Sequence, residues 1–421
     1  MTKQILFIIS LAITLGIFSF SVKRLWAFFK LTKPSYPINN IGARISHTLD
    51  VAFGQTKIFR KPVIGLMHAL VFWGFLVITL GSIEIVIDGA FGLERSFAFT
   101  GWFYDVVMGS GDVFALLIIV FIKAFSLRRS ILRIKRFSGV EMSSKSYWDA
   151  QIALGFIGLL MLSLLAFNVG YISNHPNGYE GVYPVSAVLV DIINMNLGWI
   201  QEPGWWIHIL LIFVFANYLP YSKHFHVFLS VPNVFLANLE PLTKYPNLES
   251  ITKEVKLMLD PEAAYDENEE VARFGVKDVQ DVSWKNYMDS LACTQCGGRC
   301  TDVCPANITG KLLSPRKIFV DLRKRMDDLG PLAVKGKEDG KSLLRDYITE
   351  EELWACTTCN ACAQECPIDI SHPNLIMDMR RYLVMEEAAA PTELNAMFSN
   401  IENNGAPWQF SKEDRLKWTE G

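Results

Sequence analysis

All eight cysteines of this 421-residue chain lie in two short runs in its last third. The first run, CTQCGGRCTDVCP, contains Cys293, Cys296, Cys300 and Cys304, and the second, CTTCNACAQECP, contains Cys356, Cys359, Cys362 and Cys366. Closely spaced thiols suit metal ligation, because several sulfurs can converge on one centre from one loop. Runs that end in Cys-Pro are typical of iron–sulfur clusters, and we therefore expect a protein that moves electrons.

The second run has the spacing C-x2-C-x2-C-x3-C-P, which is typical of bacterial two-cluster ferredoxins. In that pattern the fourth cysteine of each run ligates the other cluster. We therefore expect two [4Fe-4S] clusters with crossed ligands. Cluster 1 would use Cys293, Cys296, Cys300 and Cys366, and cluster 2 would use Cys356, Cys359, Cys362 and Cys304.

The first run departs from this spacing. Three residues, Gly297-Gly298-Arg299, separate its second and third cysteines, where two are usual. Two glycines can absorb an extra residue as a bulge with positive φ, so we expect cluster 1 to be retained. Structural zinc also uses CxxC pairs, and disulfides join cysteines that lie further apart. Both alternatives fit two Cys-Pro-terminated runs less well than iron–sulfur clusters do.

Long apolar stretches fill the first 222 residues, whereas charge and cysteine are concentrated in the rest. A helix needs about 20 apolar residues to cross a bilayer. Five stretches meet this requirement and predict transmembrane helices at Ile5–Phe29, Val63–Ile87, Trp102–Phe125, Trp148–Ile172 and Trp205–Tyr221. The polar residues within Val182–Ile200 predict an interfacial helix there. The formal net charge of −3 gives no indication of nucleic-acid binding, which is typical of strongly basic domains.

Lysine and arginine are concentrated in the loops after the first and third predicted spans. Basic loops stay in the cytoplasm, so the N-terminus is expected outside and everything after His226 inside the bacterial or archaeal inner membrane. The cysteine runs would then lie in a reducing compartment, which keeps thiolates available as ligands. We expect a quinone site near the basic residues Lys57, Arg60 or Lys61.

Three histidines occur in or at the end of predicted spans. His208 and His226 are 18 residues apart, which is five turns and about 27 Å of continuous helix. Both would then face one side of that helix, with His224 nearly opposite, and His68 is expected at the depth of His226. Intramembrane imidazoles are costly and often functional, and they are common haem ligands. We therefore predict a b-type haem between His68 and His226, the alternative being neutral histidines that hydrogen-bond to neighbouring helices.

The segment HILLIFVFANYLPYSKHFHVF resembles the last transmembrane helix of the gamma subunit of respiratory nitrate reductase. The matching positions are His208, Pro220, Ser222, Lys223 and His226. The resemblance implies a five-span cytochrome b domain in which His208 and His226 both ligate haem. The second span of that family supplies two more histidines, of which only His68 has a counterpart here, since Ile78 occupies the other position. One or two b haems are therefore expected.

Segments around the cysteine runs, CPANITGKLLSPRKI and CPIDISHPNLIMDMRRYLV, resemble the two-cluster module of heterodisulfide-reductase-related proteins. The tail NNGAPWQFSKEDRLKW also resembles that family, where it leads into cysteine-rich CCG domains. This chain contains no CCG motif. The resemblance implies that the partner is a separate CCG-domain subunit, or a flavoprotein such as electron transfer flavoprotein, with membrane quinone as the exchangeable substrate.

The expected architecture is mainly α-helical, with four parts. They are a transmembrane cytochrome b-like domain (1–226), a linker (227–285), a two-cluster iron–sulfur domain (286–385) and a tail that docks a partner (386–421). An amphipathic helix is predicted at Glu249–Leu259, and a helix that begins with Ser-Pro is predicted at Ser314–Met326. The acidic stretch Asp260–Glu270 is expected to be exposed. No nucleotide-binding motif occurs and no catalytic residue is predicted.

We therefore expect a membrane-bound electron-transfer subunit of an oxidoreductase complex, with no chemistry of its own on an organic substrate. It would pass electrons between a cytoplasmic redox partner and the quinone pool through two clusters and b-type haem. One alternative is the iron–sulfur and membrane-anchor subunit of a succinate-, fumarate- or glycolate-type dehydrogenase. An alternative of another class is a zinc-stabilised membrane scaffold without a redox role.

Overall fold

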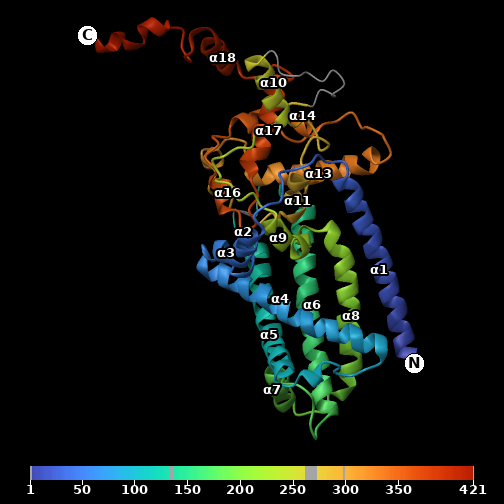
Figure 1. Cartoon of the computed structure of the whole chain (residues 1–421). Helices are drawn as coiled ribbons and strands as arrows, with labels where there is room; N and C mark the ends of the chain where they lie inside the picture. Colours follow the sequence, from blue (N-terminus) through green and yellow to red (C-terminus); the bar gives the residue numbers. More distant parts are fainter. Residues whose placement is uncertain are drawn as a thin grey trace.

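A computed structural model describes residues 2–420 except 133, 135–136, 138, 140, 261–272 and 297–298. A long helical bundle carries a second helical domain at one end (Figure 1). The described residues form helices, loops and isolated β-bridges, with no strand among them, which confirms the mainly α-helical prediction. The bulge expected at Gly297-Gly298, and all of the acidic stretch except Asp260, lie outside the described residues.

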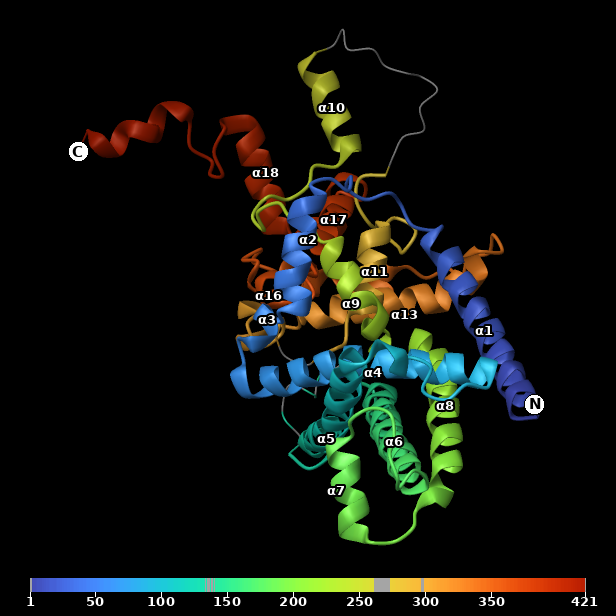
Figure 2. The same cartoon turned by 60° about the horizontal axis from the view of Figure 1, so that its bottom comes forward.

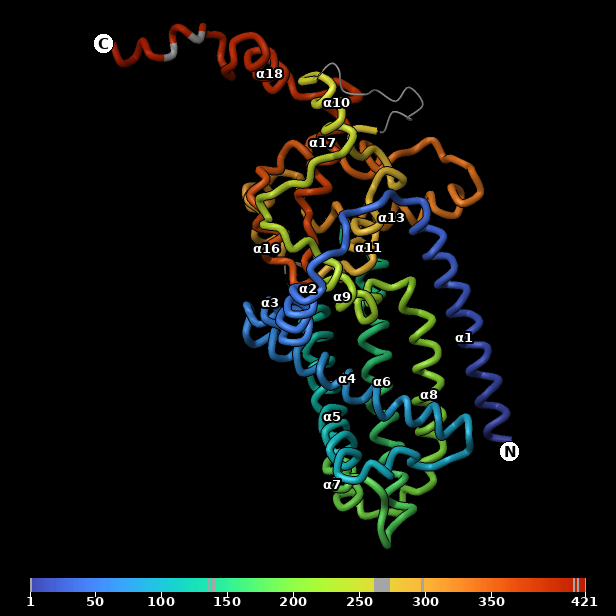
Figure 3. Tube along the Cα trace, in the orientation of Figure 1, coloured from blue at the N-terminus to red at the C-terminus, as the bar shows by residue number. Residues whose placement is uncertain are grey.

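Five helices in the described part of the chain are long and apolar enough to cross a membrane. They are α1 (Thr2–Phe29), α4 (Pro62–Phe91), α5 (Trp102–Ser130), α6 (Ser144–Asn174) and the segment Gly198–Tyr221, which is mostly α8 (Gln201–Tyr218). Each contains one predicted span, so the five helical predictions are confirmed. Helices α1, α5, α6 and α8 run along the bundle, and α4 crosses them obliquely (Figures 1 and 3).

Local sequence signals explain where these helices begin and end. Pro62 occupies the first turn of α4, where its missing amide hydrogen is not needed. Gly92 ends α4 in the left-handed region, with a φ of 71° that favours glycine. Ser143 caps α6 by accepting a hydrogen bond from the amide of Ser146. The helix that holds His68 and the helix against which His208 packs are therefore fixed by their own sequences.

Helices α6 and α8 approach closely at two glycines. A Cβ atom at Gly204 would lie 2.7 Å from the backbone nitrogen of Phe167, and one at Gly170 would lie 2.4 Å from that of Gln201. Small residues at such crossings let two helix backbones come together. This packing brings His208 of α8 against the interior face of α6.

The stretch Val182–Ile200 contains only one short α-helix, α7 (Pro184–Ile193). Ten residues are too few to cross a bilayer, which agrees with the prediction that this stretch is not a sixth span. The carboxylate of Asp112 on α5 accepts hydrogen bonds from the amides of Val185 and Ser186, at 2.8 and 2.9 Å. These bonds satisfy the free amides at the start of α7 and hold it against the bundle.

The second domain contains α11 (Trp284–Ala292), α12 (Pro305–Ile308), α13 (Pro315–Ala333), α14 (Leu343–Asp346), α15 (Glu350–Trp354), α16 (Ala361–Glu365) and α17 (His372–Met385). Its core is formed largely by buried aliphatic side chains of α13 and α17, among them Ile318, Leu322, Leu375 and Leu383. Helix α13 begins at Pro315 of the expected Ser-Pro and continues beyond Met326. Helix α10 (Glu249–Leu259) has the predicted bounds. The tail with α18 (Thr392–Asn404) projects away from the body (Figure 2).

The two domains meet at the end of the bundle opposite the N-terminus (Figure 1). Phe28, near the end of α1, is buried so tightly against α13 that a Cβ atom at Gly330 would lie 2.7 Å from its ring. Three short helices fill the rest of the junction: α2 (Ile41–Thr48), α3 (Thr56–Phe59) and α9 (His226–Phe235). The segment between α1 and α4 and the segment after α8 therefore support the cysteine-bearing domain.

The expectation of one continuous helix from His208 to His226 is wrong. Helix α8 ends at Tyr218, a 3-10 turn follows at Leu219–Tyr221, and α9 begins only at His226. Pro220 lies in that turn, where it cannot continue an α-helical hydrogen-bond ladder. Ser222 is extended, and its Oγ accepts a hydrogen bond from the amide of His224. The helical register between the two histidines is lost, so their side chains cannot be placed by counting turns.

Candidate metal centres

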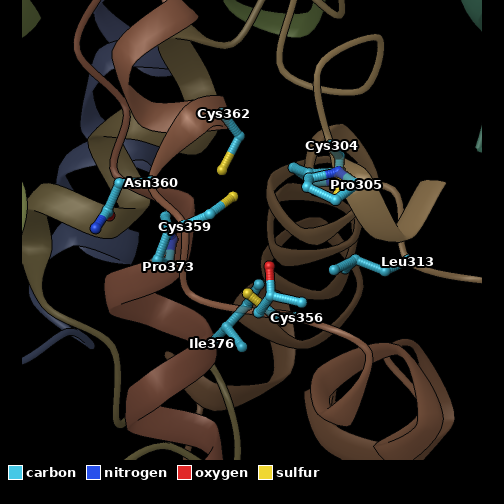
Figure 4. Close-up of a pocket in the computed structure, with 11 residues that line it drawn as sticks. Cys304, Pro305, Leu313, Cys356, Cys359, Asn360, Cys362, Pro373 and Ile376 are labelled. Carbon is cyan, nitrogen blue, oxygen red and sulfur yellow. The ribbon is translucent and has the colours of Figure 1, made fainter. Parts of the chain in front are cut away.

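Three cysteines of the second run and one of the first line a single small pocket. These are Cys356, Cys359, Cys362 and Cys304. Figure 4 shows them around one hollow, with Cys304 entering from a different segment than the other three. The set is the one expected for cluster 2.

The remaining four cysteines share a different and much larger cavity. Cys293, Cys296 and Cys300 of the first run line it together with Cys366 of the second. Cys300 and Cys366 are each 7% exposed. Each pocket therefore holds three cysteines of one run and the fourth of the other, which is the arrangement that the spacing predicts.

Backbone conformation explains how each fourth cysteine leaves its own run. Cys304 and Cys366 both have extended backbone, at the start of α12 and the end of α16, and each is followed by proline. The ring of a proline disfavours helical backbone at the residue before it, which keeps both cysteines extended. The thiols are thereby directed toward the neighbouring pocket.

Burial makes these thiols poor acids in the absence of a bound metal. Desolvation raises the pKa of Cys362 to about 12 and that of Cys293 to about 11. A metal centre must supply the positive charge that stabilises the thiolates. Four thiols around one hollow suit a four-iron cluster, in which each thiolate binds a different iron.

The larger cavity has a volume of about 600 Å³ and extends from the first cysteine run into the helical bundle. This volume is within the usual range for cofactor pockets. Most of its wall is apolar, with residues from α4, α5, α6 and α8. All three histidines that the sequence singles out, His68, His208 and His226, line it.

Two of these histidines are oriented by hydrogen bonds. Nδ1 of His208 lies 3.0 Å from the carbonyl oxygen of Leu160 and 3.2 Å from Oγ of Ser163. Its Nε2 is buried and has no hydrogen-bond partner in the described part of the chain. Nδ1 of His68 lies 3.3 Å from Oε1 of Gln55. Hydrogen bonds of this kind are typical of histidine ligands, because they fix the ring and leave the other nitrogen for a metal.

The sequence did not single out two further imidazoles that line this cavity. His224, expected on the far side of a continuous helix, reaches the cavity because of the break after α8. His372 reaches it from the start of α17, is 1% exposed, and packs edge-on against Phe319. Burial lowers the pKa of both His226 and His372 to about 3, so these side chains are neutral at pH 7 and competent as ligands.

The other histidines and the basic segment before α4 have different roles. His47 pairs with Asp369 at 2.7 Å, and Nδ1 of His175 lies 2.9 Å from the carbonyl oxygen of Tyr171. The basic residues expected to flank a quinone site contact carboxylates of the cysteine-bearing domain instead. They form the pairs Lys57–Asp369, Arg60–Glu365 and Lys61–Asp302.

Several basic side chains reach the cavity wall, and two of them, Lys61 and Arg316, are paired with carboxylates outside it. The described residues that line it include six cations and no aspartate or glutamate; the cations are Lys61, Arg128, Arg129, Lys223, Arg299 and Arg316. A ligand with a large apolar body and acidic groups at one end complements this wall. A haem, with its porphyrin and two propionates, meets that description, and neutral imidazoles are present to ligate its iron.

A family model described as a 4Fe-4S dicluster domain matches residues 292–370. This segment contains both cysteine runs and confirms a ferredoxin-type 4Fe-4S domain after the five apolar helices. No solved structure matches the chain.

Two similar proteins cover nearly the whole chain, and both are described as oxidoreductases. A probable iron-sulfur-binding oxidoreductase, FadF, of Bacillus subtilis is 28% identical over 453 residues, covering 99% of this chain and 60% of that protein. The EtfAB:quinone oxidoreductase of Syntrophomonas wolfei is 28% identical over 90% of this chain and 54% of its own length. The chain thus spans little more than half of these relatives.

A third relative matches a shorter part of the chain. It is one of the subunits of the ferredoxin/F(420)H(2)-dependent CoB-CoM heterodisulfide reductase of Methanosarcina acetivorans, and it is 34% identical over 105 residues, or 25% of this chain and 52% of that protein. The resemblance to heterodisulfide-reductase-related proteins is confirmed by this match. The chain is accordingly related to iron–sulfur electron-transfer proteins.

Proposed function

We propose that this chain carries two [4Fe-4S] clusters and b-type haem, and passes electrons between a soluble redox partner and membrane quinone. The observation that carries the proposal is the shared cavity. The cysteines assigned to cluster 1 and the three span histidines line one space, so a cluster and a haem bound there would be neighbours. Clusters and haem supply one-electron transfer when bound.

The linings of the two pockets support one order for the proposed relay. Cluster 2, held by Cys356, Cys359, Cys362 and Cys304, lies in the pocket that has no histidine in its wall. Cluster 1 lies in the histidine-lined cavity. Electrons exchanged with a soluble partner would therefore pass between cluster 2 and cluster 1 before they reach the haem.

The proposed orientation places the N-terminus outside and the cluster domain in the cytoplasm. The N-terminus and the cluster domain lie at opposite ends of α1 (Figure 1), which supports their being on opposite sides of a membrane. The basic residues of the loops near the cluster domain support the cytoplasmic side for that end.

The proposed partner is a flavoprotein such as electron transfer flavoprotein, or a CCG-domain subunit. The name of the Syntrophomonas relative supports the former, and similarity to part of a heterodisulfide reductase supports the latter. Copurification under native conditions followed by identification of the bound protein distinguishes them. A succinate-, fumarate- or glycolate-oxidising flavoprotein in that position would instead favour the membrane-anchor alternative.

Absorption spectroscopy of the purified chain tests the cofactors. We expect a broad iron–sulfur band and a sharp α-band of reduced b-type haem. His226→Ala is expected to lose that α-band and to keep its iron–sulfur absorption, because all eight cysteines are unchanged. His47→Ala is the matched control, because His47 lies outside the cavity. An intact haem spectrum in His226→Ala would reject this ligand, and a colourless, zinc-containing preparation would reject the proposal as a whole.

A further inference from the structure

One short helix in the junction is held by both cysteine runs. The guanidinium of Arg299 donates hydrogen bonds to the carbonyl oxygens of Lys57 and Ile58 in α3, the latter at 2.8 Å. In turn, Nζ of Lys57 lies 3.4 Å from the carbonyl oxygen of Cys366. The loops that carry Cys300 and Cys366, two ligands assigned to cluster 1, therefore meet on a single helical turn.

This turn leads directly to a proposed haem ligand. Helix α3 ends at Phe59, and α4 begins at Pro62, six residues before His68. The carbonyl groups at the end of a helix lack partners within the helix, and a guanidinium can satisfy two of them in a fixed geometry. Arg299 thus fastens the cluster 1 loop to the corner from which His68 extends.

Arg299 also brings a buried positive charge into the cavity. It is 8% exposed and lines the same space as Cys300 and His68. The charge of a buried cation is weakly screened, so it acts strongly on nearby centres. Reduction of an iron–sulfur cluster adds one negative charge, and a neighbouring cation stabilises the reduced form.

We propose that Arg299 positions cluster 1 on the membrane domain and raises its midpoint potential. The inference rests on the proposed function, since it requires a cluster at Cys293, Cys296, Cys300 and Cys366. It also gives a role to the unusual spacing of the first run, because Arg299 is the third residue between Cys296 and Cys300. An electron from cluster 2 would enter cluster 1 more readily with this charge in place.

The test compares three variants by EPR-monitored redox titration with dithionite. Arg299→Gln removes the charge, and Arg299→Lys keeps the charge but loses the paired hydrogen bonds. Lys335→Gln removes one exposed charge from the same domain and is the matched control. Iron and haem contents are measured in every sample.

Arg299→Gln is expected to lower the reduced-to-oxidised ratio of one cluster about tenfold at a given potential, which is about 59 mV for one electron. The other cluster and Lys335→Gln are expected to titrate as wild type, and Arg299→Lys to lie between. If Arg299→Gln fails to assemble cluster 1, Arg299→Lys still reports the loss of the hydrogen bonds and must titrate below wild type. If both clusters of Arg299→Gln titrate at wild-type potentials, the inference is overturned. It is also overturned if only Arg299→Lys assembles cluster 1 and both clusters of that variant titrate at wild-type potentials. A wild-type chain without two clusters would instead overturn the proposed function.

Discussion

Crossed ligation can be tested with two double variants that contain the same number of cysteines. Cys304 and Cys366 each line a pocket with three cysteines of the other run. Under crossed ligation, Cys300→Ser with Cys366→Ser removes two ligands from one cluster and leaves the other complete. Cys300→Ser with Cys304→Ser removes one ligand from each cluster. Ligation within each run predicts the opposite outcome for both pairs.

The expected difference is large because clusters are lost as whole units. Two [4Fe-4S] clusters contain about eight iron atoms per chain. The Cys300/Cys366 variant is expected to keep about four in one intact cluster, with one reduced EPR signal. The Cys300/Cys304 variant is expected to show no signal of a reduced four-iron cluster. A cluster with three ligands can persist in a three-iron form, so spins are counted in both the reduced and the oxidised protein.

The measurement is anaerobic purification followed by iron analysis and quantitative EPR, with haem content as the internal standard. Cys300→Ser alone is the control, because both models predict the loss of one cluster from it. One intact cluster in the Cys300/Cys304 variant, together with none in the Cys300/Cys366 variant, would refute the crossed assignment and with it the order of the relay.

Two further predictions concern the supports of the site. Lys285 and Asp289 form an ion pair at 2.5 Å with each side chain 5% exposed. Lys285→Met leaves the buried carboxylate without its cation and is expected to cost about 3–5 kcal/mol of stability. Thermal unfolding in detergent should show part of this loss restored in Lys285→Met/Asp289→Leu, and an additive loss in the double variant would contradict the pairing. Gly204→Ala places a Cβ against α6 and is expected to destabilise the α6–α8 packing by about 1–3 kcal/mol and to lower haem content. Gly155→Ala is the control, because a Cβ there meets nothing within 4 Å. Its unfolding temperature and haem content should equal those of the wild type.

The features that sequence predicted correctly are those set by local patterns. An apolar stretch of sufficient length specifies a spanning helix wherever it occurs, and all five predicted stretches form long helices. Cysteine spacing specifies a ferredoxin-type loop for the same reason, and the matched domain confirms it. The amphipathic pattern of Glu249–Leu259 gave the bounds of α10 without any knowledge of its neighbours.

The features that sequence missed depend on contacts between distant segments. The apolar pattern around Tyr218 favours a continuous helix, but the helix ends there because Pro220 cannot extend the hydrogen-bond ladder. The break then brought His224 to the cavity. His372 and Arg299 were missed because nothing in their local sequence shows that α17 and the first cysteine run border the bundle. The sequence shows the proline, but it does not show which segments pack against the bundle.

The junction between the two domains is fastened by buried polar contacts. Arg316 pairs with Glu141 at 2.7 Å, with side chains 3% and 1% exposed. Ser146 donates to the side chain of Gln295 within the first cysteine run and also accepts a hydrogen bond from Lys223. Buried ion pairs contribute little net stability, because desolvation offsets much of the attraction.

Their consequence for this molecule is geometric. Each buried contact is satisfied in only one placement of the cluster domain on the bundle, and a displaced domain would leave charges buried without partners. Electron transfer slows steeply as two centres move apart, so a fixed placement of cluster 1 beside the histidines matters more for a relay than the strength of the contact. A domain that carried its clusters by swinging between partners would need a weakly held surface, whereas the buried pairs at this junction favour a cluster 1 that stays in place.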